Sequence, residues 1–298
     1  GYKSLKNGRY SMSFIKNIIR KENIGILIYL LLNLAFIAYV YMYFMPRKEA
    51  IVWSIISYSL YFLVVFSPLG EAVLRFIFGC RRIKREDQIE KLEPLFISTY
   101  KRMMKYDKHL PKNIRVYVKR DNRFMAKSIG LRTIVISDSL LYKNNKDIEA
   151  ILAHEFAHIS NMDPVWTILV SVGNIVIAGL IVITGICLKI SGAIMKQIHP
   201  SLLLKTLKAL FFFMVSFFGG VLIVISKLFL NVSQKYNEYR ADAIVFNVGL
   251  GNELCHAIDT CIEKDQDNVF KRLFFNLQNS NERIHRLQNM GCNYKNYV

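Results

Sequence analysis

The sequence predicts a mainly α-helical integral membrane protein in which four transmembrane helices carry a cytoplasmic α+β domain. Hydrophobic residues make up 53% of the 298 residues, and they are clustered rather than spread evenly. Four runs are long enough to cross a bilayer, which needs about 20 apolar residues. Between the second and third runs lies a segment with helix-like and strand-like patterns. Together these observations predict membrane helices joined to a domain folded outside the bilayer.

The four apolar runs divide the chain into four parts. Three of the runs contain no charged residue, and the last has only Lys227, near its end, where a lysine side chain can reach the interface. We expect a basic N-terminus with a first transmembrane hairpin in 1–69, a cytoplasmic part in 70–163, a second hairpin in 164–230 and a further cytoplasmic part in 231–298. The runs themselves are Ile24–Met45, Ala50–Leu69, Pro164–Leu188 and Ala209–Leu230.

The distribution of basic residues predicts the orientation. Residues 1–23 carry six lysines and arginines, and residues 70–163 carry nineteen, so the positive-inside rule places both in the cytoplasm. The four lysines of the 189–208 loop oppose this trend. Five scattered cysteines without a CxxC pair fit a reducing compartment. No nucleic-acid motif accompanies the net charge of +18, and we expect no nucleic-acid partner. The expected location is the cytoplasmic (inner) membrane of a bacterium.

The 70–163 part reads as a small folded unit. Helical spacing predicts a helix over 86–107, which Pro94 would kink or restart. Alternating residues predict strands over 113–120 and 131–137. The segment between these strands could be a hairpin or a further edge strand that ends at Gly130.

A possible metal site lies in "EAILAHEFAHISNMDP", on a helix that we expect to start at Ile148 with Asp147 as its N-cap. His154 and His158 are four residues apart and would share one helix face, so both could bind one ion. Glu155 would lie beside that ion, where it could take a proton from a water. The alternative is an ordinary amphipathic helix with two histidines.

The third metal ligand must come from elsewhere in the chain. The candidates are His199, His256, His285 or an acidic residue farther on. If the fourth apolar run continues as a helix, Glu238 and Asp242 share a face. Glu238 would then bind zinc, and Asp242 would hold a ligand histidine. Two spans separate His158 from Glu238, which returns the chain to the same side of the membrane. The alternative is a solvated, charged helix end.

The segments "DIEAILAHEFAHISNMD" and "NEYRAD", placed around hydrophobic spans, resemble the membrane gluzincin peptidases, which include HtpX, the CAAX prenyl proteases and the mitochondrial OMA-type proteases. The four spans are most similar to the HtpX branch. The resemblance covers roughly 24–290 and implies a zincin-like catalytic domain with one Zn²⁺ per chain. It implies that His154, His158 and Glu238 are the ligands, that Glu155 is the general base, and that Asp242 supports a ligand.

The resemblance also extends to two weaker elements. "ERI" contains Arg283, which would support the active site, but the preceding "NLQNSN" lacks the His-Pro pair usual in the family, and His285 reads as a surface or core residue. A loosely matching edge strand would hold the substrate backbone. Its residues are Asn122, Arg123, Phe124, Met125 and Ala126.

The expected function is that of a zinc-dependent endopeptidase that cleaves membrane proteins or peptides in quality control or processing. Its partners would be those substrates and the bilayer; the sequence leaves the oligomeric state open. Within proteases, CAAX-type processing is the alternative. From another class, the alternative is a non-catalytic, zinc-stabilised membrane scaffold or regulator. A transporter is disfavoured because no ionisable residue lies mid-span.

Overall fold

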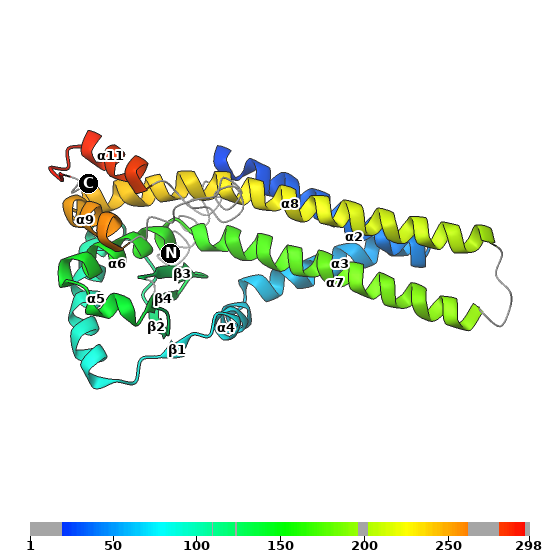
Figure 1. The fold of residues 1–298 in the computed structure, drawn as a ribbon, viewed down its shortest axis with the longest axis horizontal. Helices are drawn as coiled ribbons and strands as arrows, with labels where there is room; N and C mark the ends of the chain where they lie inside the picture. The colour runs from blue at the N-terminus through cyan, green and yellow to red at the C-terminus, as the bar shows by residue number, and fades with distance from the viewer. Residues whose placement is uncertain (1–19, 109, 123, 196–201, 262–279, 296–298) are drawn as a thin grey trace, which may run out of the picture. The chain divides into compact units, whose positions relative to one another are not determined.

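The computed structural model describes residues 20–108, 110–122, 124–195, 202–261 and 280–295 (Figure 1). The chain forms two compact units. The helical unit comprises Asn23–Phe66 and Thr167–Leu230, and the mixed unit comprises Gly1–Glu22, Ser67–Trp166 and Asn231–Val298. Each unit is described by itself below.

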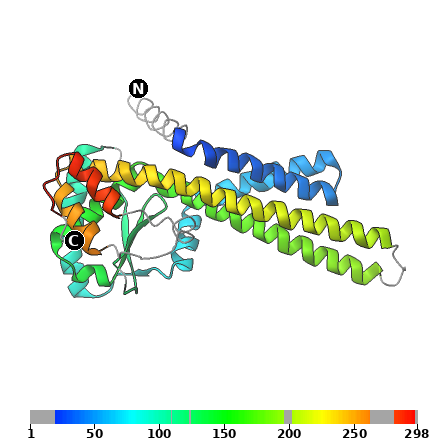
Figure 2. The same cartoon turned by 45° about the horizontal axis from the view of Figure 1, so that its top comes forward.

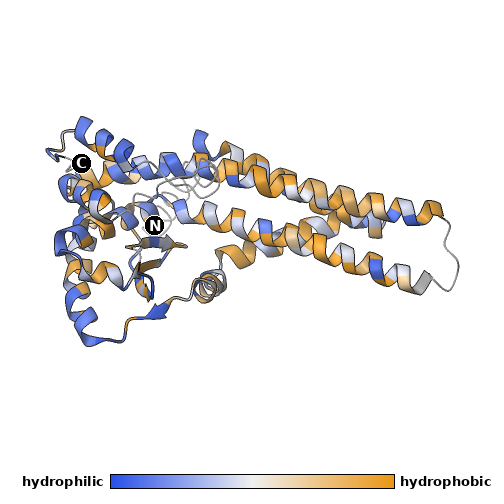
Figure 3. Ribbon diagram, in the orientation of Figure 1, coloured by the Kyte–Doolittle hydropathy of each residue, from blue (hydrophilic) through white to orange (hydrophobic). Residues whose placement is uncertain are grey.

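The helical unit is built from four long helices, each long and apolar enough to cross a membrane. Their residues within this unit are mostly hydrophobic (Figure 3), and α7 and α8 lie side by side in both views (Figures 1 and 2). A short turn, η1 (Lys21–Asn23), precedes the first. The four expected membrane helices are therefore present as candidates: α2 (Ile24–Phe44), α3 (Arg47–Phe66), α7 (Asp163–Met195) and α8 (Leu202–Asn247).

Two of the expected span boundaries are wrong. The second span ends at Phe66, because Ser67 and Pro68 begin a separate helix, α4 (Pro68–Ile77). Ser67 Oγ accepts a hydrogen bond from Gly70 N at 3.3 Å, and proline is favoured in the first turn of a helix. Most of the expected 189–208 loop is helical, since α7 extends to Met195 and α8 begins at Leu202.

The mixed unit contains a four-stranded sheet in the order β1-β2-β4-β3. The parallel pair β2–β4 forms its centre, and β3 lies antiparallel to β4 at one edge. Both expected strands are thus present, and the segment between them supplies an edge strand that ends at Ile129, one residue before Gly130, where φ is +72°. The strands are β1 (Arg81–Arg82), β2 (Arg115–Lys119), β3 (Ala126–Ile129) and β4 (Thr133–Ser137).

Helix α6 is the centre of the mixed unit, and it packs on α5, α9 and β3. The expected N-cap was wrong: Asn144, not Asp147, caps α6, and Asn144 Oδ1 accepts a hydrogen bond from Lys146 N at 2.7 Å. Pro94 lies within a continuous α5 and does not restart it. The remaining elements are α5 (Glu86–Tyr106), η2 (Ser139–Tyr142), α6 (Asn145–Ser160), α9 (Gly251–Cys261) and α11 (Ser280–Asn289).

Candidate metal and catalytic site

Three side chains of the mixed unit converge at one point. The Nε2 atoms of His154 and His158, one turn apart on α6, lie 3.0 Å from each other. Glu238 Oε2 lies 3.1 Å from His154 Nε2, and Glu238 Oε1 lies 3.3 Å from His158 Nε2. One potential ligand atom from each residue falls within 4.8 Å of the others, so the three residues could hold a metal ion.

Glu238 reaches this point because α8 continues far beyond its apolar part. The helix runs without interruption to Asn247 and so presents Glu238 and Asp242 one turn apart. The other ligand candidates lie elsewhere. His256 Nδ1 pairs with Asp147 Oδ1 at 2.8 Å, His285 is exposed, and His199 is outside the described residues.

Each histidine is contacted on its other nitrogen by an aspartate. His154 Nδ1 lies 3.0 Å from Asp242 Oδ1, although the two atoms lack the alignment of a hydrogen bond. Arg283 holds Asp242 in a bidentate arrangement, with Nε 2.8 Å from Oδ2 and Nη2 2.6 Å from Oδ1. Arg283 Nη1 also lies 3.2 Å from Glu238 Oε2. This arginine therefore links the two acidic residues of α8.

The second histidine has a matching pair of partners that sequence analysis missed. His158 Nδ1 lies 2.9 Å from Asp163 Oδ2, and Asp163 Oδ1 accepts a hydrogen bond from Arg240 Nη2 at 2.6 Å. Met162 has a left-handed backbone, with φ of +61°. It lies between the end of α6 at Ser160 and the start of α7 at Asp163. Helical spacing does not predict this contact, because the chain turns between the two residues.

The electrostatics of the site favour a bound cation. Burial lowers the pKa of His154 and His158, but the surrounding carboxylates, Glu238 foremost, raise it by more, so both values lie above the usual one. Burial also lowers the pKa of Arg283. The carboxylates of Asp242 and Glu238 raise it by more, so this pKa lies above its usual value. Two imidazole nitrogens and a carboxylate that attract positive charge are a donor set suited to zinc.

Glu155 lies beside the three-residue group rather than in it. Its Oε2 accepts a hydrogen bond from Ser128 N, on the edge strand β3, at 2.5 Å. The side chain is buried, with 6% of its surface exposed. This contact fixes the carboxylate between α6 and the edge of the sheet.

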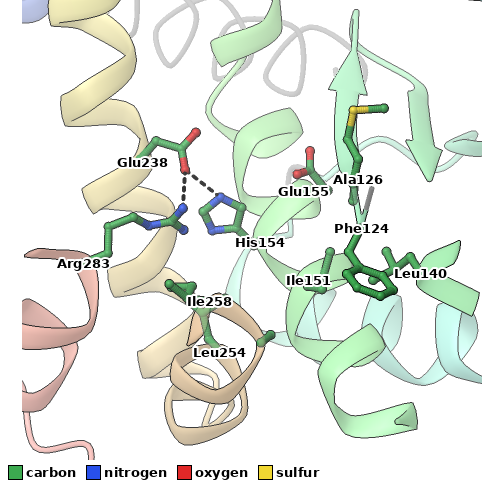
Figure 4. Close-up of a pocket in the computed structure, with 12 residues that line it drawn as sticks. Phe124, Ala126, Leu140, Ile151, His154, Glu155, Glu238, Leu254, Ile258 and Arg283 are labelled. Carbon is green, nitrogen blue, oxygen red and sulfur yellow. Dashed lines mark hydrogen bonds and ion pairs between the residues drawn. The ribbon is translucent and has the colours of Figure 1, made fainter. Parts of the chain in front are cut away.

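A cavity of about 250 Å³ opens beside Glu155, His154 and Glu238 (Figure 4). Part of the predicted substrate segment lines it, namely Phe124, Met125 and Ala126, whereas Asn122 does not line it and Arg123 is outside the described residues. Most of "NLQNSN" is also outside them. The rest of the wall is largely apolar and is formed by Leu140, Ile151, Leu254, Ala257 and Ile258, together with Arg283.

Comparison with known proteins gives one family. The sequence model of peptidase family M48 matches residues 98–288, a range that contains α6, the sheet strands β2 to β4 and the end of α8. No curated protein sequence matches the chain. Members of this family are metal-dependent peptidases, in agreement with a group of side chains that could bind a metal. The match spans more than half of the chain, and the protein therefore belongs to peptidase family M48, as a membrane-type member.

Proposed function

We propose that this protein is an integral-membrane zinc endopeptidase, similar to HtpX, whose catalytic site faces the cytoplasm. The observation that carries the proposal is the position of Glu155. Its side chain lines the same cavity as His154 and Glu238, together with Ala126 of the edge strand β3. A structural zinc site is closed by four protein ligands, whereas a catalytic site has three and an open position.

The side chains divide the work of binding the ion. His154, His158 and Glu238 would hold zinc through two Nε2 atoms and a carboxylate oxygen. When bound, zinc polarises a carbonyl oxygen and makes a water more acidic. Asp242 and Asp163 would keep each imidazole in the orientation and tautomer that binding requires.

Proton transfer is the proposed role of Glu155. Its carboxylate would take a proton from the attacking water and then deliver it to the nitrogen of the leaving amine. The Ser128 amide, hydrogen-bonded to Oε2, holds the carboxylate in place during both transfers. General acid–base catalysis of this kind contributes about 10²- to 10⁴-fold to the rate.

Arg283 would position the α8 carboxylates rather than transfer protons. Its guanidinium group contacts Glu238 (Figure 4) and also Asp242, and its pKa, raised above the usual value, keeps it charged. Because Arg283 also lines the cavity, it would be available to contact a carbonyl oxygen of a substrate bound there. The aspartate it binds is nearly fully buried, so the pair excludes water from that side.

The proposed substrates are membrane proteins or peptides, bound as an extra strand along β3. Four candidate spans support a multi-pass protein, and the basic residues of 70–163 favour a cytoplasmic site in a bacterial inner membrane. Within this proposal, processing of prenylated CAAX proteins is the alternative substrate class.

The test is cleavage of a membrane-protein substrate by purified protein in lipid nanodiscs. We expect cleavage to stop on treatment with a chelator and to return with added zinc, and we expect a parallel preparation of Glu155→Gln to be inactive. Cleavage that survives the chelator, or that is equal in Glu155→Gln, would refute the proposal. Zinc bound at one per chain without cleavage of any membrane or prenylated substrate would instead favour a scaffold.

A further inference from the structure

Helix α4 has two chemically different faces. Leu69 and Phe76 are 64% and 87% exposed, and exposed Ala72 lies between them on the same side of the helix. The opposite side carries Glu71, buried Leu74 and Arg75. We call the side of Leu69, Ala72 and Phe76 the outer face of α4. Together these three residues form one exposed apolar stripe, and contiguous exposed apolar surface is typical of contact with a protein or a membrane.

The polar side of α4 is fixed to the sheet. Glu71 Oε1 accepts a hydrogen bond from Leu131 N at 2.7 Å, and Glu71 Oε2 accepts one from Thr133 Oγ1 at 3.0 Å. Arg75 Nη1 donates to the same hydroxyl at 3.1 Å. A Cβ at Gly130 would lie 2.6 Å from the Glu71 side chain, so glycine is needed there. These contacts hold the β3–β4 turn and keep the outer face turned away from the sheet.

The chain places this helix next to a membrane span. Only Ser67 separates Phe66, the last residue of α3, from Pro68, the first of α4. Two residues of extended chain reach about 7 Å, so α4 begins within that distance of the end of a candidate span. Three exposed basic residues follow α4 closely: Arg81, Arg82 and Lys84.

We propose that the outer face of α4 lies in the headgroup layer of the bilayer, with anionic lipid headgroups bound by Arg81, Arg82 and Lys84. An amphipathic helix with apolar residues on one face and basic residues nearby has the composition of an interfacial helix. Anionic lipids attract basic segments only close to the surface, and these residues follow directly on the helix. The occupant of this face is therefore the lipid surface itself.

This placement has a consequence for catalysis that rests on the proposed function. Glu71 holds the β3–β4 turn, which begins at Gly130. Ser128, two residues before Gly130, donates its backbone N–H to the carboxylate of Glu155. A helix lying on the bilayer would thus hold the substrate-binding edge at a set height above the membrane. Peptide bonds close to the membrane surface would reach Glu155 most readily.

A depth measurement tests the placement without requiring enzyme activity. A spin label is attached to Phe76→Cys, and in a second protein to Leu69→Cys, with Cys80, Cys187 and Cys261 replaced by serine. The matched control is Tyr106→Cys, a half-exposed site that contacts Asn247 Nδ2 through its hydroxyl at 3.5 Å. Asn247 lies on α8, 17 residues beyond Leu230, the last residue of the fourth apolar run.

In nanodiscs of phosphatidylcholine with phosphatidylglycerol, we expect labels at Phe76 and Leu69 to be more accessible to oxygen than to a water-soluble nickel chelate. The Tyr106 label should show the reverse. Aqueous accessibility at both α4 sites would overturn the proposal, and so would shielding from both reagents, which indicates a covering protein or second copy.

The headgroup part of the proposal has its own test. Removing phosphatidylglycerol, or changing Arg81, Arg82 and Lys84 together to glutamine, should move the Phe76 label toward water. An unchanged label depth in both cases would overturn the role of the basic residues. Because neither measurement depends on cleavage, a failure of the proposed peptidase activity would be seen separately.

Discussion

At the scale of single residues, the two metal-binding histidine candidates have the same arrangement of partners. Each has an aspartate at Nδ1, and each aspartate is held by an arginine: Asp242 by Arg283, and Asp163 by Arg240. An acidic partner at Nδ1 directs Nε2 toward the metal and makes the imidazole a better ligand. In the proposed site, both histidines would be oriented for binding by side chains outside the group of His154, His158 and Glu238.

Asp163→Ala tests the half of this arrangement to which the sequence analysis assigned no role. The change leaves His158 Nδ1 without its carboxylate, so we expect zinc affinity to fall by about 10- to 100-fold. Competition with a chelating dye measures the affinity. The control is Asp87→Ala, which removes an exposed aspartate paired with Arg85. Equal zinc affinity in both variants would mean that Asp163 does not support the ligand.

Sequence reasoning identified residues that share a helix face and missed those brought together by a turn. His154, His158, Glu238 and Asp242 follow from i, i+4 spacing on helices, and the structure brings them together. Asp163 depends on the left-handed backbone at Met162, which no periodicity predicts. The available signal was its place in the sequence, because Asp163 is the last residue of the segment "DIEAILAHEFAHISNMD".

At the scale of elements, the edge strand β3 has a defined outer side. Met125 O accepts a hydrogen bond from Ser137 N, so the backbone of Met125 faces β4. Ser128 N instead points away from β4 to Glu155. In an antiparallel strand, the backbone N–H and C=O groups of successive residues point alternately toward and away from the neighbouring strand. The backbone groups of Ala126 therefore point away from β4, as the N–H of Ser128 does, and are available to a bound peptide.

Ala126→Pro should therefore weaken substrate binding without disturbing the sheet. Proline removes the outward N–H of Ala126, which a peptide strand would use as a donor. We expect KM to rise while zinc content stays unchanged. Ala126→Ser, which keeps the N–H, is the matched control, and Lys127→Pro, which removes an inward N–H, should unfold the edge. If Ala126→Pro cleaves with an unchanged KM, the substrate binds elsewhere.

Element types were more predictable than element ends. The apolar runs and the alternating residues predicted four long helices and two strands, because burial imposes those periods, and left the edge strand β3 as one of two alternatives. The ends depend on single contacts. Asn144 caps α6 while Asp147 is buried against His256, and Ser67 starts a new helix inside an apolar run. Composition alone does not distinguish one polar residue from another at such positions.

At the scale of the whole molecule, the site requires an even number of membrane crossings between its two halves. His158 precedes α7 and Glu238 lies in the last part of α8, so two candidate spans, an even number, separate them. The meeting of these residues in the mixed unit fits that requirement. Their side of the membrane remains a prediction from the basic residues of 70–163, and so does the four-part division of the chain.

Cysteine labelling in intact cells tests that orientation. An engineered cysteine next to Met195 should react with an impermeant reagent added outside, because we expect the segment that links α7 to α8 to be external. A cysteine at exposed Asn145 should react only after the membrane is permeabilised. The reverse pattern would move the catalytic site to the other side of the membrane.

The central claim is that Glu238 holds the metal while Glu155 moves the proton, and zinc content measured beside cleavage tests it most directly. Glu155→Gln keeps the size of the side chain, so we expect about one zinc per chain with activity reduced by at least ~10²- to 10⁴-fold. Glu238→Ala removes one of three ligand groups, so we expect zinc and activity to be lost together. Full zinc content and wild-type cleavage in Glu238→Ala, or wild-type cleavage in Glu155→Gln, would contradict this assignment.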